Sequence, residues 1–208
     1  MNTEKLIRKM QSHTPSILGN DKRLQFSILI PMIKKNDGLH VLFEVRAKKM
    51  RRQPGEICFP GGRVDQQDKS VQETAVREAI EELRIDRPAI THVYPFDYMI
   101  SPFGMLLNTF VGFLDCDETK LDPNPAEVDE IFTVPLSFFT DHPPEVHKIQ
   151  FQVKPNEDFP FDLIPGGEDY NWSTREFDEY FYKYDGKVIW GLTARVLFYF
   201  VQMIKKEG

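Results

Sequence analysis

The chain has 208 residues, the length of a single domain, and 41% of them are hydrophobic. This composition supplies enough apolar surface for a folded core and excludes a chain that is disordered throughout. Its 26 Lys and Arg residues stand against 32 Asp and Glu residues, which gives a formal net charge of −6. We therefore expect no binding of nucleic acid or of an anionic membrane through the whole surface, and any anion site must be local.

The sequence also lacks the features of exported and membrane proteins. Cys58 and Cys116 have no spacing typical of a disulfide framework or a zinc site. The apolar run at residues 24–33 is too short to span a bilayer, and Arg195 interrupts the run at residues 188–204. The first residues are charged and carry no apolar stretch of signal-peptide length. We expect a cytoplasmic protein with no membrane partner.

The first predicted element is a short amphipathic helix at residues 4–11, where Leu6, Ile7 and Met10 stand at helical spacing. A polar run at residues 12–21 separates it from the rest of the chain. We therefore divide the chain into an N-terminal helix and linker, residues 1–20, and one main domain, residues 21–208.

The main domain begins with two apolar runs, residues 24–33 and 39–45, which predict two strands of a hairpin with Asp37-Gly38 in the turn. The other expected elements are a helix at residues 71–83, strands at 91–100, 106–114, 130–134, 146–153 and 180–184, and a closing helix at 188–206. This irregular mixture indicates an α+β or layered α/β/α domain and not a doubly wound sheet.

The most informative segment is the acidic part of the predicted helix at residues 71–83. Glu78, Glu81 and Glu82 stand at helix positions i, i+3 and i+4, so three carboxylates share one face and repel one another. A hard divalent cation such as magnesium takes oxygen ligands and would relieve this repulsion. The alternative is an acidic face that is merely solvated, so the residues upstream decide between the two interpretations.

Those upstream residues favour a cation site over a merely solvated acidic face. Gly61-Gly62 allow close approach of the backbone, and Asp65 and Asp68 bring carboxylates to the loop before the helix. The spacing of Asp68 from Arg77 predicts an ion pair that fixes this loop against the helix.

Residues 62–85 resemble the signature of the Nudix hydrolases, G-x5-E-x7-R-E-U-x-E-E-x-G-U, in which U is apolar. Asp68 stands where the signature has its first Glu, and one extra residue lies between it and Arg77. Arg84 replaces the final Gly of the signature, which puts a bulkier residue where the helix is expected to end with a positive φ.

Residues 42–62 resemble the pattern L-L-T-x-R-[SA]-x3-R-x3-G-x3-F-P-G-G of the coenzyme A diphosphatase branch of that family. Phe43 and Glu44 depart from this pattern. The resemblance extends to residues 124–130 and 189–195, so it covers most of the chain.

This resemblance implies a Nudix-type α/β/α sandwich with a mixed sheet, and metal-dependent hydrolysis of the diphosphate of coenzyme A or acyl-CoA. The products would be 3′,5′-ADP and 4′-phosphopantetheine or its acylated form. The cofactor would be Mg²⁺ or Mn²⁺. The implied metal ligands are Glu78, Glu81, Glu82 and the Gly62 carbonyl, and the implied catalytic set is Glu78, Glu81, Glu82, Arg77 and Glu127.

Two further groups extend the candidate site. The basic run at residues 46–52 is either a solvated charge run or a phosphate site, in which Arg46, Arg51 and Arg52 would bind the substrate. Glu127 is either a polar loop end or a general base, and Glu78 and Glu81 are the other candidates for that base.

Rival functions remain open at this stage. The same signature would serve an enzyme acting on ADP-ribose, a dinucleotide or a nucleoside triphosphate. Its residues act on the diphosphate and do not specify the groups that flank it. A non-catalytic nucleotide-binding module is the other alternative, although such a module has no need for three self-repelling carboxylates. The sequence leaves open whether the chain forms a homodimer.

Overall fold

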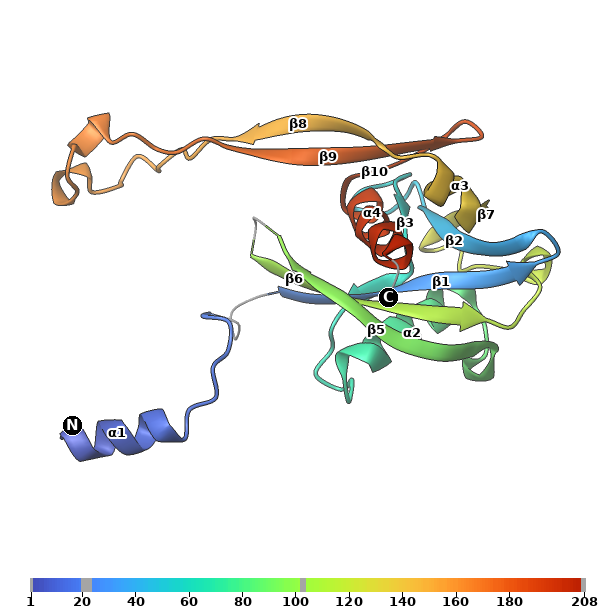
Figure 1. The fold of residues 1–208 in the computed structure, drawn as a ribbon, viewed down its shortest axis with the longest axis horizontal. Helices are drawn as coiled ribbons and strands as arrows, with labels where there is room; N and C mark the ends of the chain where they lie inside the picture. Colours follow the sequence, from blue (N-terminus) through green and yellow to red (C-terminus); the bar gives the residue numbers. More distant parts are fainter. Residues whose placement is uncertain (1, 20–23, 102–103, 207–208) are drawn as a thin grey trace.

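The computed structural model describes residues 2–19, 24–101 and 104–206 (Figure 1). The predicted domain boundary after residue 20 lies outside these residues. The α-helices are α1 (Thr3–Gln11), α2 (Val71–Leu83), α3 (Leu136–Asp141) and α4 (Gly191–Lys205). The strands are β1 (Leu24–Lys35), β2 (Gly38–Arg46), β3 (Ile57–Cys58), β4 (Gly61–Arg63), β5 (Ile90–Ile100), β6 (Met105–Leu114), β7 (Val128–Pro135), β8 (Glu145–Phe151), β9 (Arg175–Tyr184) and β10 (Lys187–Trp190).

Seven of these strands form one mixed sheet. Its main path is β3-β2-β1-β6-β5, while β4 pairs with β1 and β7 pairs with β2. The pair β1–β6 is parallel, from Leu24 opposite Met105 to Ile33 opposite Leu114, and the other pairs in this sheet are antiparallel. The predicted α+β class with a mixed sheet is therefore confirmed.

Helices cover both faces of this sheet, as Figure 1 shows for α2 and α4. Leu29 of β1 belongs to the cluster of buried side chains on the α2 face, with Ala75, Ala79 and Leu83 of the helix. Ile30, the next residue of β1, belongs to the cluster on the α4 face. Successive side chains of a strand point to opposite faces, so the apolar run predicted at this strand is buried on both sides.

A second sheet, ordered β10-β9-β8, is antiparallel. The β8–β9 ribbon extends beyond the main sheet (Figure 1). Residues 152–174 connect the two strands and hold a cluster of aromatic rings, including Phe159, Tyr170 and Trp172. Among the residues that the structure describes, no helix has the length and apolar character needed to span a lipid bilayer.

The predicted closing helix at residues 188–206 is wrong at its start. Val188 and Ile189 lie in β10, where they pair with Lys183 and Tyr182 of β9. Both residues are β-branched and suit a strand. The helix α4 begins at Gly191, whose φ of 64° ends the strand.

The turn of the first hairpin is shifted by one residue from the predicted Asp37-Gly38. Lys35 pairs with Gly38, so the turn residues are Asn36 and Asp37 and Gly38 is the first residue of β2. The short strands β3 and β4 and the helix α3 were not predicted, because segments of two to six residues give too little periodicity to recognise.

The backbone conformation of Arg84 at the end of α2 leads to a prediction about the free energy of unfolding. Arg84 caps this helix with φ 51° and ψ 49°, the left-handed conformation that Gly adopts at no steric cost. Replacing Arg84 by Gly should raise the free energy of unfolding by about 0.5–1 kcal/mol, measured by urea denaturation. Arg84→Ala is the control, because Ala keeps the Cβ and should give no such gain. An equal gain from Ala would show that the conformation of residue 84 is not the cause.

Candidate active site

The helix α2 is fixed at its N-terminus before it presents its acidic face. The Ser70 side chain accepts a hydrogen bond from the Glu73 N–H, which caps the helix. Ser27 Oγ of β1 donates to the Val71 carbonyl at 2.6 Å. Ala75 and Ala79 pack against the sheet, so the face that carries Glu78 lies toward β4 and the preceding loop.

Two glycines bring the backbone of β4 against α2. Gly61 N–H donates to Oε2 of Glu82 at 2.8 Å, and Glu82 is only 4% exposed. A Cβ built on Gly62 would overlap the carboxyl group of Glu78. The glycine pair is therefore needed for the close approach that the sequence indicated, and it lies against two of the three predicted carboxylate ligands, Glu78 and Glu82.

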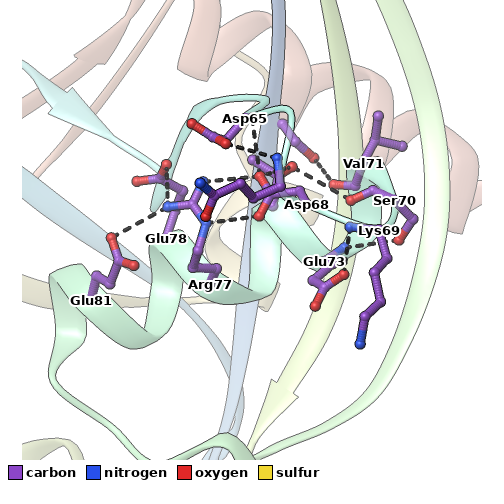
Figure 2. A network of polar contacts seen from close by, with 12 residues as sticks. Asp65, Asp68, Lys69, Ser70, Val71, Glu73, Arg77, Glu78 and Glu81 are labelled. Carbon is purple, nitrogen blue, oxygen red and sulfur yellow. Dashed lines mark hydrogen bonds and ion pairs between the residues drawn. The ribbon is translucent and has the colours of Figure 1, made fainter.

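Arg77 joins the preceding loop to the helix, as Figure 2 shows. Its Nε lies 2.9 Å from Oδ1 of Asp68, and its Nη2 donates to Oδ2 at 3.1 Å. Asp68 also accepts from Thr74 Oγ1 at 2.8 Å and from the Asp65 N–H at 3.1 Å. These bonds, with Arg77 foremost, hold the pKa of Asp68 well below its usual value. The predicted Asp68–Arg77 ion pair is confirmed.

The same guanidinium faces the acidic surface of α2. Arg77 Nη1 lies 2.9 Å from Oε1 of Glu78 and 3.3 Å from Oε2 of Glu81 (Figure 2). Burial nevertheless raises the pKa of Glu78, against the opposing effect of Arg77. Arg77 thus offsets part of the repulsion between these carboxylates and leaves a site that still favours added positive charge.

A fourth carboxylate, Glu44, lies deeper in the same region. It is 1% exposed, and sequence reasoning did not identify it as a site residue. Burial, followed by the neighbouring Glu82 carboxyl, raises the pKa of Glu44 well above its usual value. Burial likewise raises the pKa of Glu82 to about 8, although the Gly61 N–H acts in the opposite direction. A carboxylate within the apolar run at residues 39–45 was the signal that could have found Glu44.

The loop that carries Glu127 is attached to both sides of this region. Asn124 N–H donates to the carbonyl of Glu82 at 2.8 Å, and Ala47 N–H donates to the carbonyl of Glu127 at 2.8 Å. The charge of Glu127 raises the pKa of Glu82 and of Glu78. The structure therefore brings Glu127 into the electrostatic neighbourhood of the α2 carboxylates.

The basic run forms a separate hollow beside them. Arg46, Arg51 and Arg52, together with Met50, line a cavity of about 530 Å³. Arg51 and Arg52 are exposed, whereas Arg46 is half-buried at the end of β2. The charge of Arg46 lowers the pKa of both Glu44 and Glu82, so this residue borders the hollow and the carboxylates at once. All three predicted substrate-binding arginines are brought together.

The NUDIX domain family model matches residues 24–156, which is more than half of the chain. The chain belongs to the Nudix family. It is 38% identical over 122 residues to the mouse peroxisomal coenzyme A diphosphatase NUDT7, a match that covers 57% of this chain and 50% of that protein. It is 30% identical over 197 residues to an uncharacterized Nudix hydrolase, NudL, of Photorhabdus laumondii, which covers 95% of this chain and 94% of that protein.

Among solved structures, the chain is similar to the NUDIX domain of Shewanella oneidensis NrtR in complex with ADP ribose. It is 15% identical, covers 69% of this chain and 89% of that one, and has a TM-score of 0.46.

Nudix hydrolases generally use divalent metal ions, and the donors here fit one. The site offers carboxylate oxygens of raised pKa, including a buried oxygen of Glu44 without a hydrogen-bond partner among the described residues. In the described part of the chain, no group of three or more His, Cys, Asp or Glu side chains is arranged to hold a metal ion as it stands. Arg77 contacts one carboxylate oxygen of Glu78 and one of Glu81, so its charge competes with a cation for these two side chains.

Arg77 should be more sensitive to substitution than a surface arginine of this Nudix domain. Arg77→Ala removes the bidentate bond to Asp68 and leaves Asp68 buried without its cation, so we expect lower activity and a lower melting temperature. Arg77→Lys should restore only part of both, because Lys cannot make the bidentate contact. Melting curves and steady-state rates of the two variants measure this. Full activity with unchanged melting in Arg77→Ala would contradict a structural ion pair.

Proposed function

We propose that this Nudix protein hydrolyses the diphosphate bond of coenzyme A or acyl-CoA to 3′,5′-ADP and 4′-phosphopantetheine or its acylated form. The observation that carries the proposal is the juxtaposition of the carboxylates around α2 with a hollow lined by three arginines. A diphosphate needs the cations that the carboxylates attract. The additional 3′-phosphate of coenzyme A needs a separate basic site.

The carboxylates would hold Mg²⁺ or Mn²⁺ through Glu78, Glu81 and Glu82, with the Gly62 carbonyl beside them. When bound, such a cation supplies charge neutralisation for the diphosphate and lowers the pKa of a bound water. Arg77 keeps the loop at Asp68 against α2, so Gly62 stays in contact with Glu78. Arg46, Arg51 and Arg52 would orient the substrate by its phosphate groups.

Glu127 is our choice for the general base among the three carboxylates considered. Glu78 and Glu81 are paired with Arg77 and belong to the proposed ligand set. Glu127 instead accepts a hydrogen bond from Asn124 Nδ2 at 3.3 Å, from a loop beside α2. Its carboxylate would take the proton of the water as the water attacks phosphorus in line with the leaving group.

The choice of coenzyme A over other diphosphates is supported by the mouse relative, a coenzyme A diphosphatase that shares 38% identity over the matched region. The match spans only half of that protein, so the substrate is a proposal that needs its own test.

The test is a substrate panel with product analysis. The purified chain would be incubated with coenzyme A, acetyl-CoA, ADP-ribose, a dinucleotide and a nucleoside triphosphate, each with and without Mg²⁺ or Mn²⁺. We expect cation-dependent release of 3′,5′-ADP from the first two substrates at the highest kcat/KM. Faster hydrolysis of ADP-ribose would overturn the proposal that coenzyme A is the substrate, but it would still agree with hydrolysis of a diphosphate bond. Binding without hydrolysis of any compound would indicate the non-catalytic nucleotide-binding module.

A further inference from the structure

Glu44 is a buried carboxylate whose Oε1 has no hydrogen-bond partner among the residues that the structure describes. The residue is 1% exposed and lies in β2 between Phe43 and Val45. Buried polar atoms are almost always paired, because an unpaired one loses its bonds to water without replacement. An unpaired oxygen on a side chain of this kind therefore indicates that something absent from the protein chain binds to it.

The direction of Glu44 follows from the pleat of β2. Leu42, two residues earlier, packs in the buried cluster on the α2 face. Side chains two apart in a strand point to the same face, so Glu44 is directed toward α2 and the Glu82 carboxyl. The charged and titratable groups that act on it are Glu82 from α2, Glu127 from the loop before β7, Cys58 from β3 and Arg46 from β2 itself.

We propose that Glu44 is an additional carboxylate ligand of the metal site, and that its unpartnered oxygen binds a divalent cation beside Glu82. This inference rests on the proposed function, because it uses the cation that the α2 carboxylates would hold. It adds a ligand from a strand to a set that otherwise comes from the helix and from β4. Glu44 also stands at a position where the pattern of the coenzyme A diphosphatase branch has Thr, so the ligand is not one that this pattern supplies.

The contacts of the other carboxylates support the assignment. Arg77 lies against one oxygen of Glu78 and one of Glu81, so its positive charge competes with a cation at these two side chains. Glu82 is held by the Gly61 N–H through one oxygen, and Oε1 of Glu44 has no competing partner among the described residues. Magnesium sites commonly use one or two carboxylates together with substrate phosphates and water. Glu44 and Glu82 would therefore supply as many protein carboxylates as such a site commonly uses.

The test measures cation binding without substrate. Mn²⁺ would be titrated into the purified full chain and into Glu44→Gln, with free Mn²⁺ followed by electron paramagnetic resonance. Since even the outer-shell partners of metal ligands change affinity by about 10–100-fold, we expect Glu44→Gln to bind Mn²⁺ at least about ten-fold more weakly. The rise in melting temperature on adding Mn²⁺ should shrink in parallel, while circular dichroism shows that the variant is folded.

Two further variants separate a ligand from a charge effect. Glu44→Asp keeps the charge and withdraws the carboxylate by one methylene, so a ligand role predicts a loss close to that of Glu44→Gln. Glu179→Gln is the matched control, since Glu179 on β9 also has a buried oxygen without a partner in the described chain but lies against Arg195. Its Mn²⁺ affinity should equal that of the unmodified chain.

The outcomes distinguish this inference from the proposed function. Unaltered Mn²⁺ affinity in Glu44→Gln, with binding by the unmodified chain, would overturn the ligand assignment and leave the proposed function intact. Normal affinity in Glu44→Asp alone would also overturn it, because charge and not coordination would then be responsible. No Mn²⁺ binding by the unmodified chain would instead contradict the metal-dependent function itself.

Discussion

Replacement of Glu82 by Gln is expected to lower kcat by about two to three orders of magnitude at saturating Mg²⁺. Glu82 is buried, and its Oε2 accepts the Gly61 N–H, so the carboxylate occupies a defined position under β4. Gln preserves the shape and the acceptor oxygen, but it removes the negative charge that attracts the cation. Steady-state hydrolysis of coenzyme A measures the effect. A turnover equal to that of the unmodified chain would refute the proposal that Glu82 and the acidic face of α2 bind the cation.

The thermal stability of Glu82→Gln shows whether its lower kcat comes from a lost metal ligand or from damage to the fold. The pKa of Glu82 is raised to about 8 in the folded chain, above its ordinary value of 4.5. A raised pKa of this kind favours folding at pH values below 4.5, and the contribution is lost as the pH rises through 8. In the absence of metal, Glu82→Gln should therefore melt at the same or a higher temperature than the unmodified chain at pH 8. A lower melting temperature would mean that reduced activity reflects damage to the fold.

Removing the 3′-phosphate of the substrate is expected to lower kcat/KM by roughly ten-fold to a hundred-fold. Dephospho-coenzyme A keeps the diphosphate and loses one charge-assisted contact, which is worth about 1.5–3 kcal/mol. In the proposed function, this contact is made in the hollow lined by Arg46, Arg51 and Arg52. The measurement compares kcat/KM for coenzyme A and dephospho-coenzyme A under the same cation concentration.

Arginine variants identify the residue that makes this contact. Arg51→Ala and Arg52→Ala would each be assayed on both substrates, and the responsible arginine is the one whose loss lowers kcat/KM for coenzyme A alone. Lys49→Ala is the control, because Lys49 is exposed in the same loop and does not line the hollow. An equal fall on both substrates in each arginine variant would show that the loop binds the diphosphate or only maintains its own shape.

Much of the fold and of the site was predictable where the signal is local. The helix at residues 71–83 agrees with α2 because its start, its composition and its acidic spacing all lie within one segment. The Asp68–Arg77 pair was predictable because Asp68 lies just before α2 and Arg77 lies within it, close in sequence. The parallel pairing of β1 with β6 was not, since it joins segments about 80 residues apart and depends on packing between two helices.

The parts of the site that were missed depend on tertiary contacts. Glu44 is a charged residue between Phe43 and Val45, and its role becomes visible only when β2 is placed beside α2. The neighbourhood of Glu127 and Glu82 arises from a backbone hydrogen bond between Asn124 and the end of α2, which no spacing in the sequence encodes. Similarly, residues 188–190 are as apolar as the helix that follows, and only the partner strand β9 decides that they are extended.

The attachment of the Asn124–Glu127 loop has a mechanical consequence. One main-chain hydrogen bond joins Asn124 to Glu82 in the last turn of α2. Another joins Glu127 to Ala47, the first residue after β2, in the basic run at residues 46–52. A movement of the loop backbone at Glu127 would have to break at least one of these bonds, so this part of the main chain is held in place before any substrate arrives. If Glu127 is the general base that we propose, its loop needs no hinge motion to reach the site. The chemical step of the proposed hydrolysis should therefore not depend on solvent viscosity, unlike that of an enzyme whose base is delivered by a closing flap.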